Sequence, residues 1–324
     1  MRYEYYSSVS LVTSVVVYVL AMLAFAAEWA AARRVAPAAA ERRLAHAGAP
    51  VGNSPAAPTR TDAAAVDPTV DPAVGPRVDR WGRIGLALTG IAFALSLAGV
   101  VLRGLAAGRA PWGNMFEFTT SAMVFVVAVF LVGAWRFGWR WLGLPVTLLA
   151  AIGNGLAVTV FYVAVAPLVP ALHSVWFVIH IVAAAIAGAA FNVGALLSLL
   201  YLLRSRAEER GELSGSLRLL PAAARLDVLA YRFHAFAFPL WTFTVAAGAI
   251  WAEYAWGRYW GWDPKETWSL VTWVIYAGYL HARATAGWRG RRAAVIALVG
   301  VASFWFNFIG INLLVSGLHS YAGV

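Results

Sequence analysis

The chain of 324 residues contains no cysteine. It therefore cannot form disulfides, bind zinc or an iron–sulfur cluster through thiolates, or relay electrons through thiols of its own. Charged residues are also scarce, at 12% of the sequence, whereas 61% of the residues are hydrophobic and the mean hydropathy is +0.71. These values lie far from those of soluble domains. We therefore expect an integral membrane protein.

Apolar runs long enough to cross about 30 Å of hydrocarbon occur about eight times. The first run lacks a basic segment before it and is too long for a signal peptide, so we expect a membrane anchor there. The predicted fold class is an all-α, polytopic membrane protein with about eight transmembrane helices. The runs cover residues 9–32, 84–102, 119–135, 141–163, 175–203, 234–256, 267–284 and 293–316.

The positions of the basic residues predict the orientation. Of the 25 Lys and Arg residues, 20 fall in loops that follow the odd-numbered runs, and 5 fall on the other face. Basic residues concentrate on the cytoplasmic side of membrane proteins, so both termini are expected to be extracytoplasmic. The basic residues stand singly at the ends of apolar runs rather than in a patch, which argues against a nucleic-acid partner.

Three regions are predicted along the chain. Residues 1–35 form an N-terminal transmembrane helix, and residues 36–80 are rich in Pro, Ala and Asp. That composition cannot build a core, so we expect a disordered cytoplasmic linker. Residues 81–324 then form a seven-helix membrane domain.

One segment of that domain, "WGRYWGWDPKETWSLVTW" at residues 256–273, is unusually rich in aromatic residues. Pro264 suits the first turn of a helix and Asp263 its N-cap, so a helix is expected to begin inside the segment. An interfacial aromatic belt is one explanation, because Trp gathers at bilayer edges. A ligand site explains the density better. Its tryptophans are Trp256, Trp260, Trp262, Trp268 and Trp273.

Two histidines are expected on the same membrane face as the tryptophan-rich segment. His180 lies about one turn inside the fifth run, and His319 follows the last run. Taken singly, each is explained equally well as an interfacial residue with its polar edge in the headgroups. Together with the tryptophans, they provide imidazoles for iron and aromatic faces for a flat apolar macrocycle such as haem. His173 is a rival ligand that we expect in a loop, and His234 is given no role.

His281 is expected deep in the seventh run, toward the inner leaflet. An ionisable residue at that depth suggests function, although snorkelling beside Arg283 is an alternative. If it is functional, it would ligate a second metal position inside the membrane.

The charged residues of the outer face are expected to form a structural network, because carboxylates near lipid need partners. Glu253 is expected to pair with Arg258, and Lys265 with Glu266. The alternative is that Arg258 and Lys265 donate to haem propionates. Glu117 is a further carboxylate on this face.

The segments "SVWFVIH", "WGRYWGWDPKETWSLVTWVIYAGYLHAR" and "GLHSY" resemble the haem-handling proteins that carry a tryptophan-rich WWD motif. Within that group the chain is most similar to the CcsA/ResC family of System II cytochrome c biogenesis, called CcsB in some bacteria. The likeness covers about residues 81–324. The resemblance implies that His180 and His319 hold haem iron at the extracytoplasmic face of the plasma membrane, and that His281 binds haem on its way out.

The resemblance further implies a haem-binding subunit of a cytochrome c synthase, or haem lyase. Non-covalent haem b would be presented for thioether attachment to the CxxCH motif of apocytochrome c. The implied partners are a ResB/CcsB-type membrane subunit, apocytochrome c and a thioredoxin-like thiol reductant. No catalytic acid or base is evident in the chain. Two alternatives remain: a haem exporter or chaperone without ligation activity, and an electron-transfer cytochrome b.

Overall fold

The computed structural model describes residues 2–47, 75–168, 170–213 and 215–319, and every regular element in this part of the chain is helical. The prediction of an all-α protein is confirmed. The α-helices are α1 (Arg2–Ala47), α2 (Gly75–Ala107), α3 (Met115–Phe137), α4 (Gly143–Thr159), α5 (Val175–Glu209), α6 (Ala223–Trp256), α7 (Pro264–Thr285), α8 (Arg291–Trp305) and α9 (Ile311–Leu314). Short turns complete them: η1 (Trp139–Leu142), η2 (Pro170–Leu172), η3 (Gly215–Leu219) and the π-helical turn η4 (Phe306–Gly310).

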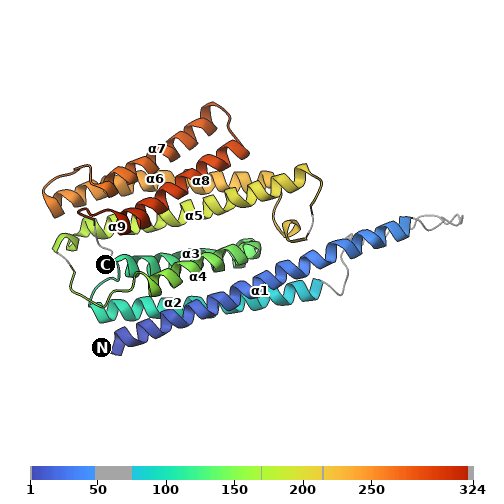
Figure 1. The fold of residues 1–324 in the computed structure, drawn as a ribbon, viewed down its shortest axis with the longest axis horizontal. Coiled ribbons are helices and arrows are strands. Elements are labelled where there is room, and N and C mark those ends of the chain that lie inside the picture. Colours follow the sequence, from blue (N-terminus) through green and yellow to red (C-terminus); the bar gives the residue numbers. More distant parts are fainter. Residues whose placement is uncertain (1, 48–74, 169, 214, 320–324) are drawn as a thin grey trace, which may run out of the picture.

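Seven helical segments of the described chain are long and apolar enough to cross a membrane. The segment missing from that set is α7, which has 22 residues but carries a polar first turn and fewer apolar residues. It packs against both α6 and α8, and the seventh predicted crossing, residues 267–284, lies on it (Figure 1). The protein is therefore a multi-pass membrane protein, while the orientation of its ends stays a prediction.

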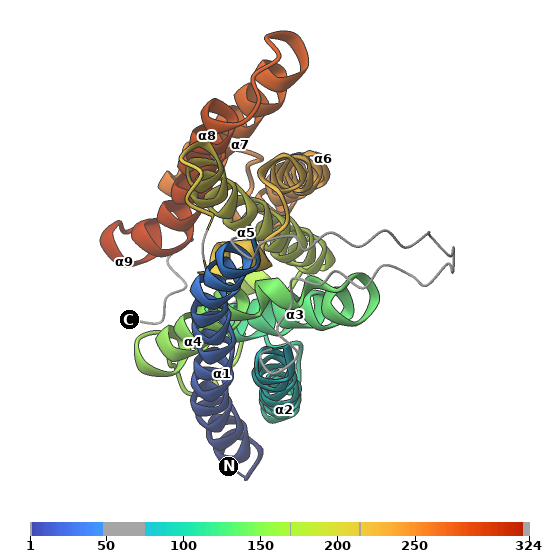
Figure 2. The same ribbon diagram turned by 90° about the vertical axis from the view of Figure 1, so that its right-hand side faces the viewer.

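The helices form two groups that lie side by side. In Figure 1, α1 to α4 form one group and α5 to α8 the other, with α3 facing α5. Tyr18, Phe25 and Phe130 belong to the core of the first group. Phe191 and Tyr276 stack in the core of the second, with ring centroids 3.8 Å apart. Figure 2, turned by 90°, shows α7 and α8 at the far edge from α2.

Helix α1 packs along α2 and α4, with Leu11, Tyr18 and Phe25 fully buried. It continues to Ala47, and α2 begins at Gly75, so the described helices enter both ends of the predicted linker. Residues 48–74 lie outside the described residues. For them, a disordered linker stays a prediction.

The loops at the two ends of the bundle differ in composition. The tryptophan-rich end carries the loops that contain residues 108–114, 160–168, 170–174 and 257–263, together with residues 315–319. The arginine-rich end carries η1 and the loops around η3 and residues 286–290. The start of α1 and α9 both lie at the tryptophan-rich end, on the left in Figure 1.

A buried ion network fixes the tryptophan-rich end. Glu117 is fully buried and accepts hydrogen bonds from Arg103 Nε at 3.0 Å, from an Arg109 guanidinium nitrogen at 2.7 Å and from Gly113 N at 2.8 Å. Arg103 also reaches Glu4 of α1, at 3.5 Å. A buried carboxylate is tolerated only when such partners satisfy it. The network therefore joins α1, α2 and α3 and holds residues 109–114 in place.

Candidate haem-binding cavity

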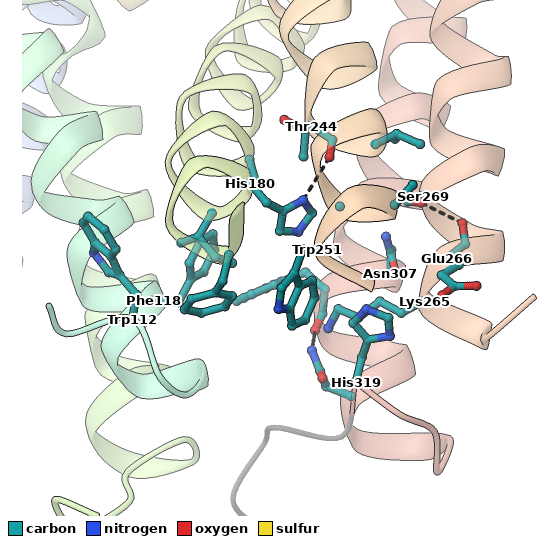
Figure 3. Close-up of a pocket in the computed structure, with 18 of the residues that line it drawn as sticks. Trp112, Phe118, His180, Thr244, Trp251, Lys265, Glu266, Ser269, Asn307 and His319 are labelled. Carbon is teal, nitrogen blue, oxygen red and sulfur yellow. Dashed lines mark hydrogen bonds between the residues drawn. The ribbon is translucent and has the colours of Figure 1, made fainter. Parts of the chain in front are cut away.

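A cavity opens at the tryptophan-rich end between the two helix groups. Its volume is about 170 Å³, and its lining is mostly apolar. The loop before α3 and helices α3, α5, α6, α7 and α8 all contribute to its walls. Two of the predicted iron ligands, His180 and His319, line it together with Trp260 and Lys265. Figure 3 shows these two histidines on either side of Trp251.

His180 lies in the second turn of α5, as its sequence position predicts. Its Nδ1 is 2.9 Å from the carbonyl oxygen of Thr244 on α6, a contact drawn in Figure 3. This close approach depends on Gly248, where a Cβ atom would lie only 2.8 Å from Nδ1 of the ring. A carbonyl can only accept, so Nδ1 carries the proton and Nε2 carries the lone pair. The contact thus prepares Nε2 of His180 to act as a ligand.

His319 lies in the segment that follows α9. Its Nδ1 is 2.8 Å from Oδ2 of Asp263, at the start of α7. Trp256 packs edge-on against the imidazole, with ring centroids 4.7 Å apart. As for His180, an acceptor on Nδ1 places the coordinating lone pair on Nε2. The acceptor here is a carboxylate rather than a neutral carbonyl.

Asp263 joins the start of α7 to the end of the described chain. Its Oδ2 accepts from Lys265 N at 3.2 Å, and Glu266 Oε2 accepts from Asp263 N at 3.1 Å, which completes a capping box. The predictions of Asp263 as N-cap and of Pro264 in the first turn are confirmed. Oδ1 accepts from Leu318 N at 2.9 Å. Burial alone would raise the pKa of Asp263, but the hydrogen bonds, that with His319 above all, lower it to about 2.

The five tryptophans of the segment have different surroundings. Trp260 lines the cavity, and Trp256 contacts both His319 and Trp251. Trp268 packs on Phe306 of η4, with ring centroids 4.3 Å apart. Trp262 is 67% exposed and has a φ of 58°, a left-handed backbone that is unusual for a residue with a side chain. Trp273 packs on α6 through Phe238 and donates to Thr242.

The charged side chains of the segment pair differently from the sequence-based expectation. Arg258 reaches Glu266, at 3.4 Å, where Glu253 was expected. Lys265 instead lines the cavity, and its Nζ lies 5.9 Å from the centre of the Phe308 ring. Burial lowers the pKa of Lys265 to about 7, although the charge of Asp263 acts in the opposite direction.

The other histidines of the described chain lie away from this cavity. His281 is exposed on α7, one turn before the arginine-rich end of that helix. His173 is in the loop before α5, as predicted, and its Nε2 is 3.3 Å from Leu168 O. His234 lies three turns inside α6, because this helix begins at Ala223 rather than near residue 234. Its side chain is fully buried. No group of three metal-ligating side chains occurs in the described residues.

Sequence reasoning missed Trp251, which is central to the cavity. Its ring centroid lies 5.7 Å from that of His180 and 5.6 Å from that of His319, and its Nε1 donates to Ala171 O at 2.8 Å. It lies five positions before Trp256, outside the segment singled out.

Asn307 was missed as well. Its amide bridges Lys265 O and Ser269 N of α7, each at 3.3 Å, from the π-helical turn η4. Such turns are often found at functional sites.

These features define a class: multi-pass helical membrane proteins with an aromatic, histidine-bearing cavity at one end. A family model described as "Cytochrome C assembly protein" matches residues 86–319. The chain is 33% identical to the cytochrome c biogenesis protein CcsA of Picosynechococcus sp., and the match covers 76% of this chain and 89% of that protein. It is 34% identical to CcsA of Gloeobacter violaceus, covering 76% and 88%. With CcsA of Chlamydomonas reinhardtii it shares 44% identity over 48% of this chain and 43% of that protein.

The chain therefore belongs to the CcsA family of cytochrome c biogenesis proteins, as the sequence resemblance predicted. Its role is in the maturation of c-type cytochromes.

Proposed function

We propose that the chain is the haem-binding subunit of a cytochrome c synthase. It presents haem at the extracytoplasmic face of the plasma membrane for attachment to the CxxCH motif of apocytochrome c. The observation that carries the proposal is that His180 and His319, which are far apart in the sequence, line one apolar cavity. Nδ1 of each histidine is held by a hydrogen-bond acceptor.

The donor set of the cavity fits haem b as the cargo. Imidazoles whose Nδ1 donates to an acceptor carry their lone pair on Nε2, the atom that would ligate iron. Trp251, Trp260 and Phe308 supply aromatic walls for an apolar macrocycle. Lys265 supplies a cation within reach of the same space. These are the groups that a tetrapyrrole with carboxylate side chains requires.

The chemistry of attachment is consistent with a chain that contains no cysteine. Each thioether forms by addition of one substrate S–H across one vinyl C=C bond, so that sulfur bonds to one carbon and hydrogen to the other. Both thiols come from apocytochrome c, kept reduced by a thioredoxin-like protein. The role of this chain is to hold the haem in a fixed position near them.

His281 supports a second haem position within the membrane. Its side chain is exposed on α7, turned away from the core of its helix group. A second axial ligand at this place would therefore have to come from another chain. A ResB-type partner subunit is the proposed source.

The test is spectroscopic and uses the chain co-purified with its ResB-type partner. The complex should carry haem with a six-coordinate, bis-histidine absorption spectrum. We would replace both His180 and His319 by Gly in a His281→Ala background, so that haem held at His281 does not mask the result. This variant should lose the haem, and imidazole should restore it. His173→Ala, a change in the exposed loop histidine, should leave it intact. Unchanged haem in the variant would overturn the proposal.

Two other functions remain distinguishable by experiment. A haem exporter would carry the same haem but form no thioether when the complex is mixed with reduced apocytochrome c. An electron-transfer cytochrome b would exchange electrons rapidly with quinol. The position of both histidines at one end of the bundle argues against the latter, because such carriers usually hold haem between facing helices within the bilayer.

A further inference from the structure

Lys265 lines the mostly apolar cavity, and among the described residues no carboxylate forms an ion pair with it, although the charge of Asp263 favours its protonated form. Among the described residues, the ion pairs of this region join Arg258 to Glu266 and His319 to Asp263, and none includes Lys265. Figure 3 shows the Lys265 side chain extending from α7 toward Trp251 and His319. An ammonium group held away from water without a directly paired carboxylate is unfavourable. Binding of an anionic group at this position would remove that penalty.

Arg258, the other basic residue of the segment, does not share this arrangement. Its guanidinium reaches Glu266, whose second oxygen accepts from Gly261 N and Asp263 N. Arg258 does not line the cavity, whereas Lys265 does. The charge of Arg258 therefore already holds the loop that precedes α7.

We propose that Lys265 recognises a carboxylate of the bound tetrapyrrole and so fixes the in-plane orientation of the macrocycle. This inference rests on the proposed function. Imidazoles bind the central metal whatever the rotation of the ring about its axis, so they leave the positions of the ring edges undefined. A single charged contact at the cavity wall defines them. The vinyl edge, on the side of the ring away from the carboxylates, is then held at the opposite side of the cavity.

Asp263 and Asn307 both hold the backbone of Lys265 in place. Asp263 caps the turn in which Lys265 lies, and the Asn307 amide bonds to the Lys265 carbonyl. The backbone of Lys265 is thus held by the cap of α7 and by η4, which form two walls of the same cavity. A side chain on a fixed backbone samples fewer positions than one on a mobile loop, which favours discrimination between ligand orientations.

The experiment compares two ligands that differ in whether their two propionate groups carry charge. Zinc protoporphyrin and its dimethyl ester would be titrated into the haem-free complex in neutral detergent, with binding followed by porphyrin fluorescence. The free acid should bind the unaltered protein about tenfold or more tightly than the ester, the range of a charge-assisted hydrogen bond. Lys265→Met should weaken binding of the acid to the level of the ester. Lys265→Arg should keep most of the preference, because it keeps the charge.

The outcomes separate the possible failures. If neither porphyrin binds, the proposed function itself fails. If acid and ester bind the unaltered protein equally, only the assignment of Lys265 fails. If Arg258→Gln rather than Lys265→Met abolishes the preference, the carboxylate lies at Arg258 and the assignment is wrong. If Lys265→Met leaves the preference intact but lowers binding of a fluorescent phosphatidylglycerol, the anion is a lipid phosphate, which also overturns it.

Discussion

Nδ1 of His319 lies 2.8 Å from Oδ2 of Asp263, although the two residues are 56 positions apart in the sequence. His180 has a neutral partner instead, the carbonyl of Thr244. A carboxylate that accepts from a coordinated imidazole increases the basicity of the ring, and loss of such a partner commonly costs about 10- to 100-fold in metal affinity. The two proposed iron ligands are therefore chemically unequal.

This inequality predicts the effect of Asp263→Asn. Asparagine is also a good N-cap, so the start of α7 should be preserved while the negative charge beside His319 is lost. Ferric haem should bind about tenfold or more weakly, and the reduction potential of the remaining haem should become more positive. A redox titration and haem quantification measure both effects. Asp227→Asn, at the opposite end of the bundle, is the matched control and should change neither.

The substitution Gly248→Ala separates the stability of helix α6 from the position of the His180 ring. Alanine is favoured over glycine in a helix by about 1 kcal/mol, so Gly248→Ala should not unfold α6. Its Cβ atom would nevertheless lie 2.8 Å from the His180 ring and displace it. We expect haem content and the bis-histidine spectrum to be lost. Gly155→Ala in α4, where a Cβ atom meets open space, should retain both.

How much of this arrangement is predictable from sequence depends on the range of the interactions involved. The helices and the Asp263–Pro264 start of α7 depend on composition and on neighbouring residues, and the sequence predicts them correctly. The choice of Glu266 over Glu253 as the partner of Arg258 depends on the path of residues 257–263. A left-handed residue, Trp262, shapes this path. Periodicity contains no information about such a turn.

The same limit applies to contacts between distant segments. Topology alone predicts His180 and His319 on one face, but not that each has a particular acceptor on Nδ1. Trp251 looks like an ordinary residue of an apolar helix until α5 and residues 315–319 are placed around it. Its two histidine contacts join positions that are far apart in sequence. Only the folded chain brings them together.

The predicted orientation is testable because the chain has no native cysteine. Tyr259→Cys places a thiol in the exposed loop of the tryptophan-rich end, and Arg210→Cys places one at the arginine-rich end. In intact cells or spheroplasts, a membrane-impermeant maleimide should label only the Tyr259→Cys variant. After permeabilisation it should label both. Labelling of Arg210→Cys alone in intact cells would put the cavity on the cytoplasmic side and contradict the proposed function.

Trp251 is predicted to form the wall against which the macrocycle packs. Trp251→Phe keeps an aromatic ring but removes the hydrogen bond to Ala171, and Trp251→Ala removes the wall entirely. Haem content should therefore fall in the order unaltered protein, Phe variant, Ala variant. Truncation of a buried Trp costs about 3–5 kcal/mol, so the elution profile of each variant must be checked for folding. Trp135→Ala, in a side chain that is 86% exposed on α3, should bind haem normally. Equal haem in all variants would exclude Trp251 from the site.

The lowered pKa of Lys265 predicts how binding of an anionic tetrapyrrole depends on pH. Burial lowers the pKa from 10.5 to about 7, so the ammonium loses its proton as the pH rises through 7 in the unliganded protein. Over the same interval the unfolded chain binds more protons than the folded chain. The folded state consequently becomes relatively more stable between pH 7 and 10.5. A ligand carboxylate interacts favourably only with the charged form, so affinity for zinc protoporphyrin should fall from pH 7 to pH 9.

Two controls isolate Lys265 as the cause of this pH dependence. The dimethyl ester carries no carboxylate, so its affinity should vary less over the same range. Lys265→Arg should keep high affinity at pH 9, because arginine stays protonated. A parallel decline for the acid, the ester and the Arg variant would mean that another group titrates. In that case the cation at the cavity wall does not control binding, and the orientation of the macrocycle must be set by the shape of the aromatic walls.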